Sequence, residues 1–383
     1  MPELIGLLPW AVMVLAAVSL HVRRPRLRTY AEATYGPLVS VSVPARHEAA
    51  NLGPLLSSLA KTTYGNREVI VVDDRSTDGT GDIVSAMLER TDGWLRLVEG
   101  QDLPPGWFGK PWACWQGYRA ARGDVLLFTD ADTRHEADLL GRTIAALEDQ
   151  KADLLTIMPE QTLGSFWERS VMPHMLFMLG MRYRTQHLNR TRNPLHVVAN
   201  GQYIMMPRAS YEAIRGHEAV KHEVVEDLRL AQTVVAAGRK LYVTHAEEFM
   251  RTRMYRSLRG ILEGWTKNVA IGAGYSVHRA FGAAVPWLLV AFMVVGWIRP
   301  PGVLLMEAFA DVPDRLVTWA LGATILSLAF WMLVNLRMRV PPLYALIYPV
   351  GAVVASIIVA RSALRGTRVL WKGREYGVPA ATP

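Results

Sequence analysis

Asp130 and Asp132 are separated only by Ala131 and follow a run of apolar residues, in the segment LLFTDADT. Where a strand ends and the chain turns, two carboxylates at this spacing can reach one hard cation, with other oxygen atoms completing its shell. Mg²⁺ or Mn²⁺ held in this way binds a diphosphate and acts as a Lewis acid when the diphosphate departs. The pair therefore predicts a divalent metal, and the metal predicts a phosphate leaving group.

Polar residues also follow two earlier apolar runs. Pro44, Arg46 and Glu48 come directly after LVSVSV, and Asp74 comes after REVIVVD. A single Asp after a strand is commonly a helix cap or a turn residue. Ligands of a parallel sheet, however, bind beyond the carboxyl ends of its strands. Three polar strand ends at one edge therefore indicate a binding site rather than three unrelated turns.

The elements that position these residues alternate along the chain. Short β-rich runs predict strands at 38–43, 67–74, 95–98, 124–130 and 153–158. Helical stretches between and after them are expected at 51–61, 80–90, 111–121 and 136–149. Strands separated by helices of this length predict an α/β fold with a mostly parallel, doubly wound sheet covered on both faces.

Long apolar runs lie at both ends of the 383-residue chain, of which 51% is hydrophobic. The runs at 281–298, 316–336 and 342–360 are long enough to cross a hydrocarbon core of about 30 Å. Residues 4–20 are also uncharged, and their basic flank follows the apolar stretch, which is the reverse of the signal-peptide order. We therefore expect a retained N-terminal anchor.

Arginines fix the expected orientation, because basic residues flank membrane helices on the cytosolic side. Those that follow the first run are Arg23, Arg24, Arg26 and Arg28. The net charge of +8, next to apolar runs, fits an anionic membrane surface better than nucleic acid. We thus expect a multi-pass protein of the cell inner membrane with a cytosolic α/β domain.

The expected domains follow from these runs. They are an anchor at 1–30, a catalytic domain at 36–250, an interfacial linker at 251–280, membrane helices at 281–360 and a basic cytosolic tail at 361–383. Two readings remain open for 342–360. It either crosses as one straight helix, or it is a broken or re-entrant segment, since Pro349 and Gly351 lie inside it.

Several segments together resemble glycosyltransferase family 2, whose fold is GT-A. They are VPARHEAANL, VIVVDDRSTDGT, LPPGWFGKPWACWQG, LLFTDADT and VVEDLRLAQTVVAAGRKL. The block GWFGKPWA, with EGWTKN and WKGREY, is similar to membrane-bound members that glycosylate carotenoids, hopanoids or related polyisoprenoid lipids. This resemblance implies inverting transfer of a sugar from a nucleotide-diphosphate sugar, expected to be a UDP-sugar, to a hydroxyl or carboxylate of such a lipid.

The resemblance also assigns roles on the donor side. Asp132 would be the main ligand of Mg²⁺ or Mn²⁺, with Asp130 supporting it or touching the nucleotide sugar. The uracil or ribose would be bound by Asp74, in a pocket lined by Pro44, Arg46 and Glu48. Lys110 is suited to meet phosphate because Gly109 lets the backbone approach and lysine supplies a point charge. A solvated loop lysine is the alternative.

On the acceptor side, Asp227 of the segment HEVVEDLRLAQ would take the proton from the acceptor. Asp227 and Glu226 equally suit the first turn of a helix. Further contacts with the acceptor or the diphosphate are expected from Glu226, Trp265, Lys372 and Arg374.

The number of sugars transferred is the last expectation. Processive members carry QxxRW, and the segment ILEGW here keeps only Trp265, which favours the addition of one or few sugars. A polysaccharide synthase of the same family is the alternative enzyme, and a non-catalytic lipid-binding scaffold is the alternative of another class.

Overall fold

The computed structural model describes residues 6–19, 24–365, 368–371 and 374–377. It divides into two compact units, each made of several chain segments. The α/β unit comprises Arg24–Thr162, Tyr183–Met254 and Thr367–Pro383, and the helical unit comprises Met1–Arg23, Leu163–Arg182 and Tyr255–Gly366.

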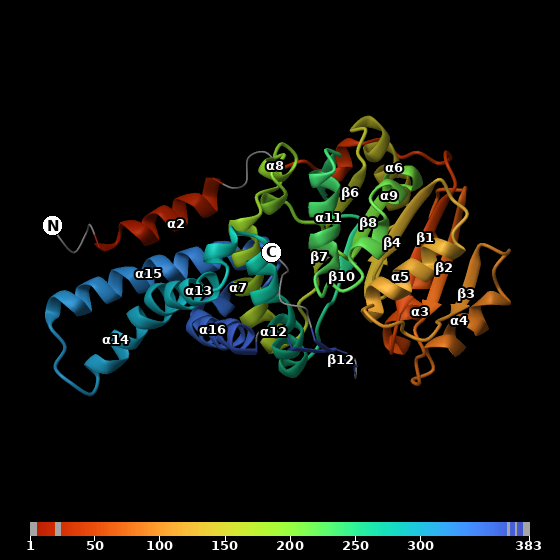
Figure 1. Cartoon of the computed structure of the whole chain (residues 1–383). Coiled ribbons are helices and arrows are strands. Elements are labelled where there is room, and N and C mark those ends of the chain that lie inside the picture. Colours follow the sequence, from red (N-terminus) through yellow and green to blue (C-terminus); the bar gives the residue numbers. More distant parts are fainter. Residues whose placement is uncertain (1–5, 20–23, 366–367, 372–373, 378–383) are drawn as a thin grey trace. The chain divides into compact units, whose positions relative to one another are not determined.

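A seven-stranded sheet in the order β3-β2-β1-β4-β8-β6-β9 forms the centre of the α/β unit (Figure 1). The strands are β1 (Val39–Ala45), β2 (Arg67–Asp73), β3 (Leu95–Glu99), β4 (Val125–Thr129), β6 (Leu154–Met158), β8 (Tyr203–Pro207) and β9 (Leu241–His245). β8 runs antiparallel to both of its neighbours, whereas every other pair in this sheet is parallel. The expected mostly parallel sheet is therefore confirmed, with one reversed strand that the sequence did not reveal.

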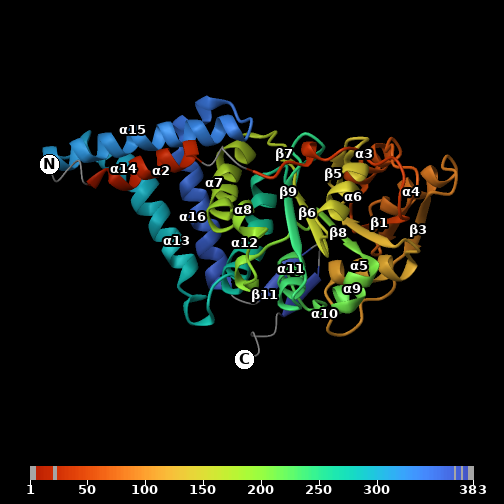
Figure 2. The ribbon, with the colours of Figure 1, turned by 90° about the horizontal axis from the view of Figure 1, so that it is seen from above.

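Helices cover both faces of this sheet, as Figure 2 shows from above. One face carries α3 (Ala49–Leu59), α4 (Thr80–Leu88) and α6 (Leu139–Asp149), and the other carries α5 (Gly109–Ala120) and α11 (Glu226–Ala236). β4 shows why both layers form. Leu127 packs into the first core, while Leu126 and Phe128, which point the other way, pack into the second. Cys114, the only cysteine, is buried in the second core at 1% exposure.

A small sheet lies beyond the end of β4. It contains β5 (Thr133–His135), β7 (Glu160–Gln161) and β10 (Met250–Thr252), with β10 in the middle. The remaining elements of the α/β unit are η1 (Leu27–Thr29), α8 (Thr185–Leu188), η2 (Pro194–His196), α9 (Arg208–Ala213), α10 (Gly216–Ala219), and the antiparallel pair β11 (Arg368–Trp371) and β12 (Arg374–Gly377).

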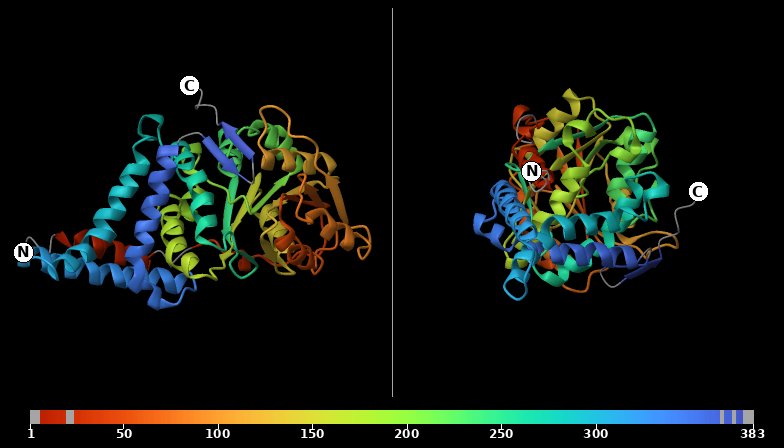
Figure 3. Two further views of the ribbon diagram at one scale, coloured as in Figure 1. Left: turned by 90° about the horizontal axis from the view of Figure 1, so that it is seen from below. Right: turned by 90° about the vertical axis from the view of Figure 1, so that its left-hand side faces the viewer.

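The helical unit is a bundle (Figure 3). Its elements are α2 (Leu8–Ser19), α7 (Phe166–Arg182), α12 (Leu258–Tyr275), η3 (Arg279–Phe281), α13 (Val285–Met293), the π-helix η4 (Val294–Ile298), α14 (Arg299–Glu307), α15 (Asp314–Arg337), η5 (Pro342–Ile347) and α16 (Tyr348–Arg365). α15 packs against α2 and α14, and α16 packs against α7, α12 and α13. Within the described residues, three stretches are long and apolar enough to cross a membrane: Val285–Glu307, Asp314–Arg337 and Pro342–Arg365.

α16 runs unbroken through the two residues at which a break was considered. Pro349 is the second residue of this helix, where proline is tolerated because the first-turn amides have no intrahelical partner. Gly351 lies where α16 meets α7, since a Cβ atom there would collide with the Ser170 carbonyl and the His174 ring. The reading of a helix broken at these residues is therefore wrong; the glycine permits close packing instead.

Candidate active site

Arg46 and Asp74 meet where β1 and β2 end. The Arg46 guanidinium donates a 2.6 Å hydrogen bond to the Asp74 carbonyl and lies 3.9 Å from the Asp74 carboxylate, which is 2% exposed. Glu48 is the N-cap of α3, and its main-chain amide donates to the Thr80 hydroxyl at 2.9 Å. Pro44 lies beside Val72 in the paired strands. These four predicted pocket residues therefore gather at one edge of the sheet.

Asp130 and Asp132 follow β4 directly at the same edge. The Asp130 carbonyl accepts a hydrogen bond from the Thr133 hydroxyl at 2.8 Å, and the Asp132 carbonyl accepts one from the Arg253 amide at 3.5 Å. Burial raises the pKa of the Asp130 carboxyl, and the charges of Glu226 and Glu48 add to this shift although Lys110 opposes it. The influence of Glu48 means that the ends of β1 and β4 share one electrostatic environment.

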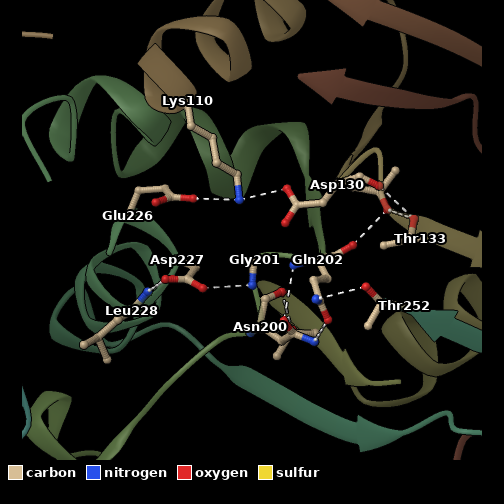
Figure 4. A network of polar contacts seen from close by, with 12 residues as sticks. Lys110, Asp130, Thr133, Asn200, Gly201, Gln202, Glu226, Asp227, Leu228 and Thr252 are labelled. Carbon is tan, nitrogen blue, oxygen red and sulfur yellow. Dashed lines mark hydrogen bonds and ion pairs between the residues drawn. The ribbon is translucent and has the colours of Figure 1, made fainter. Parts of the chain in front are cut away.

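Lys110 joins the end of β4 to the first turn of α11, as Figure 4 shows. Its ammonium nitrogen lies 2.8 Å from Asp130 Oδ1 and 2.9 Å from Glu226 Oε1. Lys110 is the second residue of α5, so it belongs to a helix rather than to a solvated loop. Burial disfavours its charge, yet Asp130, Glu226 and Asp227 together raise the pKa of Lys110 well above its usual value.

Asp227 is held by main-chain donors on both of its oxygens (Figure 4). Oδ2 accepts a hydrogen bond from the Gly201 amide at 3.0 Å, and Oδ1 accepts one from the Leu228 amide at 2.8 Å. Burial, followed by the negative charge of Glu226, raises the pKa of Asp227 to about 6, although Lys110 and the two amides oppose the shift. A carboxylate with this pKa suits proton transfer near neutral pH.

Sequence reasoning missed the segment Asn200–Gln202, which completes this network. The Asn200 side chain donates to the Ile157 carbonyl at 3.0 Å, and the Gln202 side chain donates to the Thr252 hydroxyl at 3.2 Å. Because β8 is antiparallel, the residues that precede it arrive at the edge where the parallel strands end. The one available signal was a glycine between polar residues, followed by the apolar run YIMM.

Gly201 allows the chain to approach the carboxylate. A Cβ atom at this position would lie 2.9 Å from Asp227 Oδ2 and 3.2 Å from Lys110 Nζ. We expect Gly201→Ala to lower kcat by roughly tenfold or more, because a small displacement of a reacting group carries a large kinetic cost. Gly53→Ala in α3 is the matched control, since its new methyl group would only touch Ile83 at 3.7 Å. Unchanged kcat in Gly201→Ala would contradict a requirement for this close approach.

The donor atoms fit a hard divalent cation. Within the described part of the chain, no group of three or more His, Cys, Asp or Glu residues is arranged to hold a metal ion. Mg²⁺ commonly needs only one or two carboxylates, because substrate phosphates and water complete its shell. Asp130 and Asp132 supply carboxylates of this kind at the end of β4. Since Lys110 already engages Asp130, Asp132 is the better candidate for the principal ligand.

The other predicted contacts are Trp265, Lys372 and Arg374. Trp265 is buried in α12, where its indole nitrogen lies 3.2 Å from the sulfur of Met172 within the helical unit. Arg374 begins β12, and Lys372 lies outside the described residues. The network drawn in Figure 4 therefore brings together Lys110, Asp130, Glu226 and Asp227.

Comparison with known proteins supports this fold and indicates the class of enzyme. The family model of glycosyl transferase family 2 matches residues 40–215. The 4,4'-diaponeurosporenoate glycosyltransferase of Staphylococcus aureus (strain N315) is 28% identical over 270 residues, which are 70% of each chain. The protein of the same name from strain MRSA252 is 28% identical over 254 residues, which are 65% of each chain.

A solved structure shares the fold. It is described as mannosyltransferase PcManGT from Pyrobaculum calidifontis in complex with GDP-Man and Mn²⁺. The TM-score is 0.58 at 18% identity, and the match covers 95% of this chain and 98% of that one. The expected GT-A fold is thus confirmed. Residues 40–215 are thus similar to glycosyl transferase family 2, and the protein is a glycosyltransferase.

Proposed function

We propose that this protein is a membrane-bound inverting glycosyltransferase that moves one sugar from a nucleotide-diphosphate sugar to a hydroxyl or carboxylate of a polyisoprenoid-type lipid. The observation that carries the proposal is the contact network at the carboxyl end of β4, where Lys110 joins Asp130 to Glu226, the residue before Asp227. The relative from Staphylococcus aureus is named for a carotenoid-type acceptor. The three apolar helices suit an acceptor that resides in a membrane.

The residues divide the reaction between donor and acceptor. The nucleotide would lie against Arg46, Glu48 and Asp74, at the ends of β1 and β2. A divalent cation held by Asp132, with Asp130 in support, would supply Lewis-acid stabilisation to the departing diphosphate. Asp227 would accept the proton of an acceptor hydroxyl. The oxygen of that hydroxyl would bond to the anomeric carbon of the sugar as the bond from this carbon to the diphosphate breaks. Attack opposite to the departing diphosphate inverts that carbon.

Lipid mass spectrometry tests the function directly. Cells with and without the gene should differ by a lipid whose mass is shifted by one sugar, and this species identifies donor and acceptor together. A new polymer without such a lipid would favour the polysaccharide synthase. Nucleotide binding without turnover of any nucleotide sugar would favour the scaffold. Because the similar mannosyltransferase is in complex with GDP-Man and Mn²⁺, binding tests should include GDP as well as UDP.

The decrease of kcat/KM at low pH should reflect the protonation of Asp227. A base must be ionised to accept a proton, so kcat/KM should fall below about pH 6, by about tenfold per pH unit. An ordinary carboxylate would place this decrease near pH 4 instead. The measurement is kcat/KM between about pH 4 and 8, with stability checked at each pH. A decrease of kcat/KM centred near pH 4 would indicate that a group other than Asp227 accepts the proton.

The carboxyl terminus should lie on the same side of the membrane as Asp132. β11 and β12 belong to the α/β unit, and Arg24, Arg26 and Arg28 follow α2 as cytosolic flanks should. Three crossings between the α/β segment that ends at Met254 and the tail would place these on opposite sides, so one of the three apolar stretches must not cross; we propose that it is Pro342–Arg365, as an unbroken helix. A protease added to sealed inverted vesicles should cleave an epitope at the carboxyl terminus. An epitope in the α/β unit is the control, and protection of the terminal epitope alone would contradict the prediction.

A further inference from the structure

Lys110 occupies a position that its own helix does not favour. It is the second residue of α5, and the positive end of a helix dipole repels a cation in the first turn. Its side chain is 24% exposed, so water alone does not offset that repulsion. The two carboxylates within 2.9 Å of the ammonium nitrogen do so instead. The placement of Lys110 therefore depends on acids from two other elements.

Those acids belong to the two halves of the candidate site. Asp130 follows β4, on the side of the metal and the donor, whereas Glu226 begins α11, beside the candidate base. The carboxylate of Glu226 is 9% exposed and points to Lys110 rather than to Asp227 (Figure 4). The lysine thus bridges the donor side to the acceptor side of the same sheet edge.

The bridge also bears on Asp227. Glu226 and Asp227 are consecutive residues of the first turn of α11, so fixing one side chain restrains the backbone that carries the other. A Cβ atom at Gly201 would lie close to both Asp227 Oδ2 and Lys110 Nζ, which shows that the ammonium and the carboxylate border the same glycine. Loss of the bridge would remove the Lys110 contact from Glu226 and allow the first turn of α11 to move.

We propose that Lys110 is a positioning residue that, by bridging Asp130 and Glu226, holds the first turn of α11 so that Asp227 faces the reacting centre. This inference rests on the proposed function, in which Asp227 is the base. It replaces the expectation that Lys110 binds phosphate, because the ammonium already engages two carboxylates. A phosphate ligand would govern donor affinity, whereas a positioning residue governs the rate of the bound complex.

The test compares donor-site binding with turnover in the full-length protein. Binding of Mn²⁺ with UDP, and of Mn²⁺ with GDP, is measured by calorimetry on the purified protein. Turnover is the formation of the sugar-shifted lipid in isolated membranes at equal protein content. We expect Lys110→Met to lower turnover about tenfold or more while the Kd for the metal nucleotide stays within about twofold. Lys61→Met, on an exposed lysine after α3, is the matched control.

Two further variants keep the test decisive if Lys110→Met is unstable. Lys110→Arg retains a cation that can bind both carboxylates, so it should recover most of the turnover. Adding Glu226→Gln to Lys110→Met removes the negative charge that Lys110 contacts on α11. The double variant should therefore lose less turnover than the product of the two single losses.

Two results would overturn the inference. One is a Kd for the metal nucleotide that weakens in parallel with the loss of turnover, which would make Lys110 a phosphate ligand. The other is strictly multiplicative behaviour of Lys110→Met and Glu226→Gln. If the proposed function itself is wrong, the result is different. Asp227→Asn would then retain its turnover, regardless of the effect of the Lys110 variants.

Discussion

Asp132→Asn is expected to lose roughly 10²-fold or more in turnover, because Lewis-acid stabilisation of a departing diphosphate is worth several kcal/mol. An amide keeps the shape of the carboxylate but lacks the negative charge that holds a hard cation. Metal-dependent binding of the nucleotide should weaken with it. The measurements are turnover and calorimetric binding of Mn²⁺ with UDP, and the matched control is Asp92→Asn on an exposed loop residue.

The metal itself gives a second measurement of the same site. The parent protein should lose turnover in excess chelator and recover it with Mg²⁺ or Mn²⁺. Excess metal should restore Asp132→Asn only in part, since Asp130 remains but is engaged by Lys110. Full turnover of the parent protein in chelator would reject a metal at this acidic pair.

Asp227→Asn should lower turnover but leave nucleotide affinity unchanged, whereas Asp132→Asn should lower both. The loss of a general base typically lowers turnover by about 10²–10⁴-fold, and the donor site at the ends of β1, β2 and β4 remains intact. The amide has one acceptor oxygen, so it can keep only one of the hydrogen bonds from Gly201 and Leu228, and the melting temperature of the variant must be measured beside its turnover. Affinity for Mn²⁺ with UDP should remain within about twofold.

The acid limb of the pH profile should disappear in this variant. An equal loss of nucleotide affinity and turnover would move Asp227 from catalysis to the binding site. Retained turnover with an unchanged pH profile would instead assign proton transfer to another acid, and Glu226 is the neighbour to test next.

The residues proposed for the donor side could be located from the sequence because their positions depend on local signals. Each parallel strand is a short apolar run, and the polar residue at its carboxyl end follows it directly, as Asp130 follows Phe128 and Thr129. Strand register then brings these ends to one edge without any long-range information. The helices between the strands were likewise predicted to within a few residues.

The acceptor side depends on features that no local pattern carries. The apolar run that forms β8 carries no signal of strand direction. Its antiparallel pairing with β4 and β6 could therefore not be inferred from the sequence. The approach of Gly201 to Asp227 follows from that reversal. Similarly, the partners of Lys110 lie 20 and 116 positions away in the chain, and only the folded sheet brings them to its ammonium group.

Trp265 was predicted from a motif, and its contact with the acceptor stays a prediction. The segment ILEGW kept one residue of a pattern found in processive enzymes, and that residue was assigned to the substrate. In the structure its indole packs on Met172 within the helical unit. A buried tryptophan contributes a large apolar area to the packing of its helix, so the structure adds a packing role to the predicted contact.

The single cysteine has a practical consequence for every labelling experiment on this protein. Cys114 lies on the buried face of α5, and burial raises the pKa of its thiol, so the reactive thiolate is scarce at neutral pH. Maleimides and thiol-specific spin labels should therefore not react with the parent protein while it is folded. A cysteine introduced at any exposed position would then be the sole point of attachment, and site-specific fluorescence or distance spectroscopy could be applied without first removing the native residue.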